Sequence, residues 1–141
     1  MLIADDDEND LYCLRRAIQK AGLRCEVFEA ADGQQVIDYL KGEAPYADRA
    51  LYPVPDLLVL DLEMPRRNGL EVLEWLQGQP QFRGLPIAIL SGTDQREYVA
   101  QARRLGAKDF LIKPSDFNSL VRLVRDLETK WLAAPARAST P

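Results

Sequence analysis

The chain has 141 residues, a formal net charge of −4 and 47% hydrophobic residues. This length fits one domain of ordinary size, and the hydrophobic fraction is sufficient for a proper core. The acidic balance argues against a dedicated DNA- or RNA-binding surface. The chain has no histidine, which excludes histidine-based general-base chemistry, histidine-ligated metal sites and a phosphohistidine on this chain.

The sequence indicates neither a membrane span nor a secretory leader. No apolar run approaches the length that crosses a bilayer, and the residues after Met1 lack a signal-peptide pattern. Cys13 and Cys25 are too few for a disulfide framework, so we expect reduced thiols. We therefore expect a cytoplasmic protein that binds neither membrane nor nucleic acid.

Apolar runs and amphipathic stretches alternate along the chain. Strands are expected at 1–4, 24–30, 57–60, 85–90 and 108–112. Helices are expected after a cap at Asn9 or Asp10 up to Gly22, from Asp32 to Gly42, from Leu70 to about Gly78, from Gln95 to Leu105, and from Asp116 to Trp131. The expected inner faces are Tyr98, Val99 and Ala102 on the fourth helix, and Phe117, Leu120, Val121, Val124, Leu127 and Trp131 on the last.

Strict alternation of strand and helix predicts an α/β fold, with a five-stranded parallel sheet, helices on both faces and right-handed crossovers. The most economical strand order is 2-1-3-4-5, one of the two common doubly wound layouts. One domain is expected over 1–132, followed by a disordered tail at 133–141. The long connection at 43–55 contains three prolines, and it is either functional or a plain surface insertion.

The third predicted strand ends at a carboxylate. Leu57 to Leu60 form a short unbroken apolar run, which is typical of a strand buried on both faces in the middle of a parallel sheet. Asp61 follows directly and should lie at the carboxyl edge, where open α/β sheets bind their ligands. The simpler alternative is that Asp61 only ends a strand at the surface.

The other strands end in chemically related side chains. In the predicted order, strands one, three, four and five adjoin at their carboxyl edge, and they end in Asp5 and Asp6, Asp61, Ser91 and Lys113. Three carboxylates repel one another unless a cation joins them, and Mg²⁺ suits a site with few protein ligands. An ammonium and a hydroxyl across from such a metal could hold a phosphoryl group, with Asp61 as its nucleophilic acceptor.

These motifs resemble the receiver domain of two-component response regulators. The matching pieces are Asp5-Asp6, Asp61-Leu-Glu-Met-Pro-Arg-Arg-Asn-Gly69, Ser91-Gly92 and Gly106-Ala-Lys-Asp-Phe-Leu-Ile-Lys-Pro114. They occur in order, and the resemblance covers residues 1 to about 132. It implies a flavodoxin-like receiver fold with Mg²⁺ as cofactor and a sensor histidine kinase as partner.

The resemblance implies roles for the acidic residues. Asp61 resembles the phosphoacceptor, and Asp6 a direct Mg²⁺ ligand. Asp5 resembles a ligand that acts through a water, and the backbone carbonyl of Glu63 a third contact. The side chains of Glu63 and Thr93 are expected to tune the lifetime of the phosphorylated state.

The resemblance also implies a switch. Ser91 resembles the switch hydroxyl, and Lys113 the phosphoryl-pairing lysine, with a cis peptide bond before Pro114. The switch aromatic falls on Phe110, which lacks the phenol hydroxyl. Burial of this ring is therefore expected, whereas a hydrogen-bonded form of the switch is not.

The long proline-containing connection and the end of the last helix resemble a narrower group, the small stand-alone regulators that partner bacterial phytochromes and related sensor kinases. Such a protein acts by binding or by passing its phosphoryl group onward. Two alternatives stay open at this point. One is a Mg²⁺-dependent phosphatase or phosphotransferase of haloacid-dehalogenase type, in which Glu63 would stand where that class has a second Asp. The other is a degenerate, metal-free binding module.

The apolar residues of the last two helices predict self-association. Leu123 falls off the inner stripe of the last helix, Trp131 and Leu132 extend beyond the expected sheet, and Tyr98 is placed to point partly outward. We expect a two-fold homodimer through the fourth helix, fifth strand and fifth helix. The alternative is that Trp131 folds back on the core.

Overall fold

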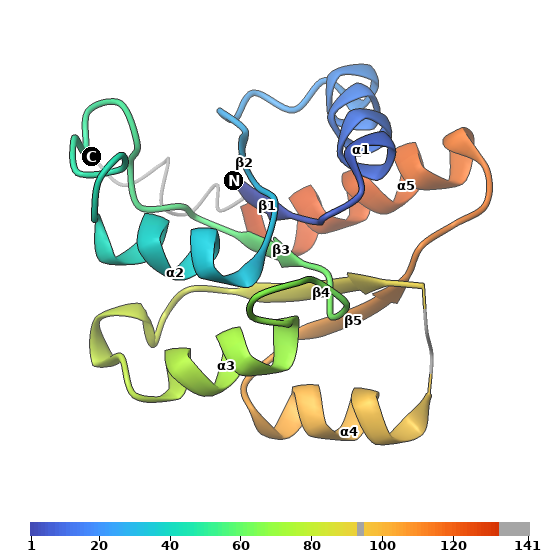
Figure 1. Cartoon of the computed structure of the whole chain (residues 1–141). Helices are drawn as coiled ribbons and strands as arrows, with labels where there is room; N and C mark the ends of the chain where they lie inside the picture. The colour runs from blue at the N-terminus through green and yellow to red at the C-terminus, as the bar shows by residue number, and fades with distance from the viewer. Residues whose placement is uncertain (93–94, 133–141) are drawn as a thin grey trace.

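The sheet is fully parallel and has the predicted strand order. The computed structural model describes residues 1–92 and 95–132, so the expected tail at 133–141 lies outside the described residues. Five strands form one sheet in the order β2-β1-β3-β4-β5 (Figure 1). Their bounds are Leu2–Ala4 (β1), Phe28–Ala30 (β2), Leu58–Leu60 (β3), Ile87–Ser91 (β4) and Asp109–Ile112 (β5).

Helices cover both faces of the sheet. Those on one face are α1 (Glu8–Ala21) and α5 (Phe117–Leu127), and those on the other are α2 (Gly33–Lys41), α3 (Gly69–Gln77) and α4 (Arg96–Arg104) (Figure 1). A short 3₁₀ helix, Pro80–Phe82 (η1), follows α3, and a π-helical turn, Glu128–Leu132 (η2), continues α5. The predicted doubly wound architecture is confirmed. Among the described residues, none of the helices combines the length and apolarity that spanning a membrane requires.

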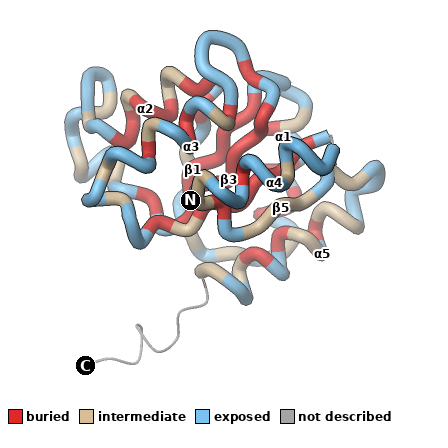
Figure 2. Tube along the Cα trace, turned by 90° about the horizontal axis from the view of Figure 1, so that it is seen from below, coloured by how far each residue is buried: buried red, intermediate tan, exposed pale blue. Residues whose placement is uncertain are grey.

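The central strand is buried on both sides, as its sequence predicts. Leu58 and Leu60 pack into the core beneath α2, α3 and α4, whereas Leu57 and Val59 pack into the core beneath α1 and α5. All four side chains are at most 2% exposed, and Figure 2 shows the buried residues concentrated along the sheet. The alternating side-chain directions of a strand thus supply two cores from one apolar run.

Two expected boundaries were wrong. The second strand was expected at 24–30 but covers only Phe28–Ala30, because it is an edge strand and its single neighbour β1 offers three residues for pairing. The cap of α1 is Asp7, not Asn9 or Asp10. The Asp7 carboxylate accepts the backbone N–H groups of both those residues, which satisfies donors that a helix start leaves unpaired.

The expected inner faces of the last two helices need two corrections, at Tyr98 and Phe117. Tyr98 and Phe117 are each 40% exposed, because Tyr98 turns away from the core and Phe117 is the first residue of α5. Trp131 is partly buried against the core beneath α1 and α5, as are Leu123 and Leu132. Trp131 therefore folds back on the core, which was the alternative to an outward position, and most of the expected exposed apolar patch is absent.

The long connection between α2 and β3 is anchored by arginine and tyrosine side chains. Arg49 donates hydrogen bonds to the backbone carbonyls of Tyr39 at 2.9 Å, Leu40 at 2.7 Å and Tyr52 at 3.1 Å. These bonds therefore tie the last turn of α2 to the connection that follows it. The rings of Tyr46 and Tyr52 pack against Tyr39 with centroids 5.1 and 6.0 Å away. This connection is a packed element rather than a loose insertion.

Tyr39 predicts a pH dependence of stability. Burial raises the pKa of Tyr39 to about 12, and its hydroxyl donates to the Pro53 carbonyl at 2.9 Å. The unfolded chain ionises this phenol near the ordinary value of about 10. Because the folded state then holds the proton more tightly, the free energy of unfolding should fall as the pH rises from about 10 to about 12. Tyr39→Phe should make this fall shallower.

The measurement is the urea midpoint of the wild type and of Tyr39→Phe between pH 8 and pH 11.5. Tyr12→Phe, which changes an exposed phenol, is the control and should keep the wild-type slope. Equal slopes for Tyr39→Phe and the wild type would contradict the assignment.

Candidate functional site

The carboxyl ends of the strands bring the predicted side chains together. The Asp5 N–H donates to the Ala30 carbonyl at 3.1 Å, and the Asp61 N–H donates to the Ala4 carbonyl at 3.0 Å. Each of these backbone bonds continues the parallel ladder by one residue beyond its strand. Asp5 and Asp61 are therefore held by the sheet itself, on adjacent strands.

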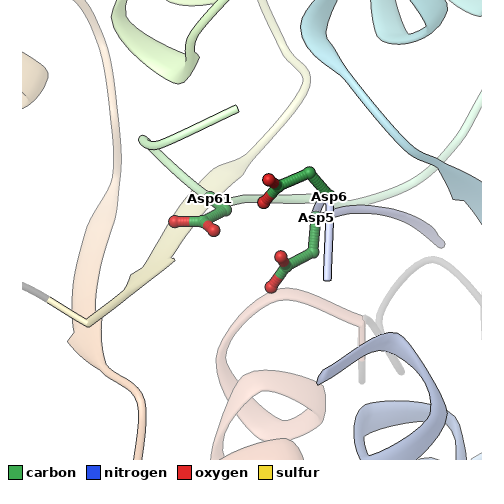
Figure 3. Close-up of side chains that lie close together, drawn as sticks. All are labelled: Asp5, Asp6 and Asp61. Atoms are coloured by element: carbon green, nitrogen blue, oxygen red, sulfur yellow. The ribbon is translucent and has the colours of Figure 1, made fainter. Parts of the chain in front are cut away.

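Three carboxylates share one small space. Oxygen atoms of Asp5, Asp6 and Asp61 all lie within 4.8 Å of one another, at the ends of β1 and β3 (Figure 3). Asp5 is 7% exposed and Asp61 5%, whereas Asp6 is open to solvent. An all-oxygen ligand set with one side facing solvent suits a hard divalent cation that keeps several waters. The donor chemistry of the cluster therefore fits a divalent metal ion.

Lys113, which follows β5, forms ion pairs with acidic residues of the site. Its ammonium lies 2.7 Å from Asp5 Oδ2, 2.8 Å from Asp10 Oδ2 and 3.2 Å from Asp61 Oδ2. Asp10 was predicted only as a possible helix cap, and its place in the site was missed. The available signal was its position in the first turn of α1, which starts directly above the carboxyl edge of the sheet.

The crowding shifts two pKa values. Burial raises the pKa of Asp5 to about 6; the charge of Asp61 adds to the rise, whereas hydrogen bonds from Lys113 and the Asp7 N–H oppose it. Burial alone would lower the pKa of Lys113. Hydrogen bonds to Asp10 and Asp5 and the charge of Asp61 outweigh burial, so this pKa lies above its ordinary value. Lys113 is therefore a fixed positive charge among acids that repel one another.

The predicted switch residues lie on neighbouring strands. Ser91 ends β4, is fully buried, and accepts the Lys113 N–H on its backbone carbonyl at 2.8 Å. Phe110 pairs with Ile89 across β4 and β5, and its half-buried ring packs against the core beneath α2, α3 and α4. The fold therefore brings the hydroxyl-bearing residue and the aromatic ring onto adjacent strands.

The expected cis peptide bond before Pro114 is wrong. Among the described residues the cis peptide bond is Ala44–Pro45. The trans form is the lower-energy isomer of an X–Pro bond, and with it Lys113 reaches the carboxylates of Asp5, Asp10 and Asp61.

The side chain of Glu63 is exposed, and the backbone N–H of Glu63 donates to Asp61 Oδ1 at 3.3 Å. Thr93 lies outside the described residues.

Comparison with known proteins connects this geometry to a family. Residues 1–125 match the response regulator receiver domain. The response regulator Rcp1 of Synechocystis sp. is 24% identical over 132 residues, which cover 94% of this chain and 88% of Rcp1.

Two solved structures are similar over almost the whole fold. Response regulator RPA3017, described in red light signalling of R. palustris, has a TM-score of 0.87 and 30% identity, covering 93% of this chain and 92% of that chain. The phosphorylated cyanobacterial phytochrome response regulator RcpA has a TM-score of 0.85 and 26% identity, covering 94% and 92%. The chain therefore belongs to the response regulator receiver family of two-component signalling, and it is similar to the regulators of phytochrome systems within it.

Proposed function

We propose that this receiver accepts a phosphoryl group on Asp61 from a sensor histidine kinase, and then signals by changing its binding surface or by passing the phosphoryl group onward. The observation that carries the proposal is the grouping of Asp5, Asp6 and Asp61 within 4.8 Å, beside the Lys113 ammonium. A carboxylate nucleophile, a cation site and a fixed ammonium are what phosphoryl transfer to an acid requires.

In this proposal the sensor histidine kinase supplies the phosphoryl donor. Since the chain has no histidine, the phosphohistidine belongs to the kinase. The likeness to RcpA and RPA3017 supports a bacterial phytochrome as that kinase. The proposed receiver domain spans 1–132.

The proposed cofactor is Mg²⁺. Asp6 would bind it directly and Asp5 through a water, while Asp61 and the backbone carbonyl of Glu63 complete the protein's share. When bound, Mg²⁺ would offset the negative charge that gathers on the phosphoryl oxygens. Asp61 and Glu63 are two residues apart on one loop, and Asp5 and Asp6 follow the neighbouring strand, so two chain segments provide the whole ligand set.

The transfer itself needs little from the protein beyond placement. A carboxylate oxygen of Asp61 bonds to phosphorus as the P–N bond of the phosphohistidine breaks, and the bonding electron pair leaves with the imidazole nitrogen. Lys113, 3.2 Å from Asp61, can then pair with a phosphoryl oxygen in place of a carboxylate.

The alternative of a haloacid-dehalogenase type phosphatase loses its support. Glu63 stands where that class has a second Asp, and the chain belongs to the receiver family. A degenerate, metal-free module is likewise disfavoured, because the three acids lie within 4.8 Å of one another and Lys113 pairs with Asp5 and Asp61. The receivers to which the chain is similar are signalling regulators rather than classical enzymes.

Asp61→Asn should abolish phosphorylation and leave the fold intact, because the change is nearly isosteric and relieves repulsion with Asp5 and Asp6. The measurement is labelling with acetyl phosphate and Mg²⁺, read as an acid-stable, base-labile acyl phosphate. Asp126→Asn, an exposed change on α5, is the control and should label like the wild type. Full labelling of Asp61→Asn would sink the assignment.

Asp6→Ala should weaken Mg²⁺ binding by about tenfold or more, because losing a direct ligand should cost at least as much as losing an outer partner. Phosphorylation should be lost with it. Calorimetric titration with MgCl₂ measures the affinity, with Asp126→Ala as the exposed acidic control. Unchanged affinity in Asp6→Ala would show that Asp6 is not a ligand.

Ser91→Ala should still accept the phosphoryl group but fail to change affinity for the kinase. The phosphoryl group adds roughly two negative charges within reach of Ser91, and movement of that residue would open space for the Phe110 ring. Kinase affinity is measured with and without acetyl phosphate, with the exposed Ser115→Ala as control. The same affinity change in Ser91→Ala and the wild type would rule out this route.

A two-fold homodimer through α4, β5 and α5 stays a prediction. Leu123 and Trp131 pack inward and are not available for such an interface. On β5, the exposed apolar side chain that could contribute to the dimer is Ile112, which is 43% exposed. A two-fold contact would use this residue on both partners. Light scattering should find a dimer at micromolar concentration, and Ile112→Asp should be a folded monomer. A monomeric wild type, with and without a phosphoryl mimic, would refute the dimer.

A further inference from the structure

An ion pair joins the loop after Asp61 to the start of α2. The Arg66 guanidinium donates from Nε to Asp32 Oδ2 at 2.9 Å and from Nη2 to Asp32 Oδ1 at 3.2 Å. Asp32 is 8% exposed, and it also caps α2 by accepting the Gln35 N–H. Bidentate arginine–carboxylate pairs are among the stronger and more directional polar contacts, so this one can fix where the loop lies.

The backbone of the same arginine is held in an unfavourable conformation. Arg66 has φ of +65°, and among the described residues it is the non-glycine residue with positive φ. Side-chain-bearing residues rarely adopt this region, and they keep it only where the surroundings hold them there. The bidentate contact with Asp32 restrains this position, together with the hydrogen bond from the Arg67 N–H to the Pro65 carbonyl at 2.7 Å, which spans Arg66.

Two further contacts press the loop and α2 together. The Gly33 N–H donates to the Arg67 carbonyl at 3.0 Å, and a Cβ on Gly33 would lie only 2.0 Å from that oxygen. Arg67 in turn donates from Nε to Gln34 Oε1 at 2.9 Å. Glycine is therefore required at the point where the two loops touch.

The strand order places these contacts close to the end of β1. Strand β1 lies between β2 and β3, so a contact from the loop after β3 to the loop after β2 passes around the end of β1, which carries Asp5 and Asp6. The loop after β3 begins at Asp61 and contains Glu63. The junction thus restrains the loop that carries Asp61 and Glu63 against the loop after β2, which lies on the other side of the strand end that carries Asp5 and Asp6.

We propose that Asp32 and Arg66 are positioning residues for the Mg²⁺ site. They touch neither metal nor phosphoryl group; they hold the β3–α3 loop at the distance from β1 that lets both segments bind one ion. The inference rests on the proposed function of the acidic cluster and adds to it two residues outside the cluster. Ligand geometry held by outer contacts commonly governs metal affinity.

The test is the Mg²⁺ affinity of Arg66→Gln and Asp32→Asn, measured by calorimetric titration. Asparagine caps helices as well as aspartate does, so Asp32→Asn spares the start of α2. The two variants change the net charge in opposite directions. A purely electrostatic role would therefore strengthen Mg²⁺ binding in Arg66→Gln and weaken it in Asp32→Asn. Positioning predicts that both weaken it, by about tenfold, and that the double variant is no worse than either.

Two more variants separate positioning from charge and from backbone strain. Arg83→Gln removes the same charge at an exposed position outside the junction, and it should bind Mg²⁺ nearly as the wild type does. Arg66→Gly accepts positive φ without strain but loses the side chain, so positioning predicts the same weakening as in Arg66→Gln. Wild-type affinity in Arg66→Gly would overturn the proposal.

Hydrogen exchange without added Mg²⁺ gives a readout independent of the metal. The amides of 62–68 should exchange faster in Arg66→Gln than in Arg83→Gln, and equal rates would contradict a positioning role. Asp6→Ala distinguishes failure of the proposed metal site from failure of the positioning role alone. If Asp6→Ala keeps its Mg²⁺ affinity, the metal site itself is wrong; if it loses affinity while Arg66→Gln and Asp32→Asn keep theirs, only the positioning role is wrong.

Discussion

Repulsion among carboxylates at one edge of the sheet is the constraint on which this site depends. Asp5 and Asp61 are held by backbone bonds on adjacent strands, so they cannot move apart without breaking the ladder. The Lys113 ammonium joins them and Asp10, and it supplies one positive charge against three acids. That imbalance makes the site receptive to a divalent cation and then to a phosphoryl group, which gives the lysine a new partner.

The same edge of the sheet connects the acidic site to the proposed switch residues. Lys113 follows β5 and donates its N–H to the carbonyl of Ser91 at the end of β4, while Phe110 lies on β5 next to β4. A change in the partner of Lys113 therefore acts on the two strands that carry the proposed switch. On the other side, Asp32 and Arg66 tie the acceptor loop to α2. In the two proposals taken together, the site is held in place toward β2 and is coupled to the switch toward β5.

The sequence predicts most of what the strand order decides. Periodicity gives five strands and five helices, and the position of Asp61 after a fully apolar run places it at the central edge, as found. The sequence does not predict contacts that depend on the orientation of a helix or on the conformation of a single residue. Asp10 reaches Lys113 because of how α1 lies over the sheet, and Arg66 pairs with Asp32 from a backbone conformation with positive φ. Trp131 was ambiguous because the turn after α5 decides whether it points inward.

The role of Asp61 as the acceptor in a Mg²⁺-dependent phosphoryl transfer can be tested on the wild-type protein. The protein is treated with acetyl phosphate and Mg²⁺, the acyl phosphate is trapped by borohydride reduction, and the reduced residue is located by peptide mass spectrometry. One reduced residue is expected, at Asp61, and its formation should depend on Mg²⁺. Reduction at another acidic residue instead, or labelling that is unchanged when the metal is chelated, would contradict it.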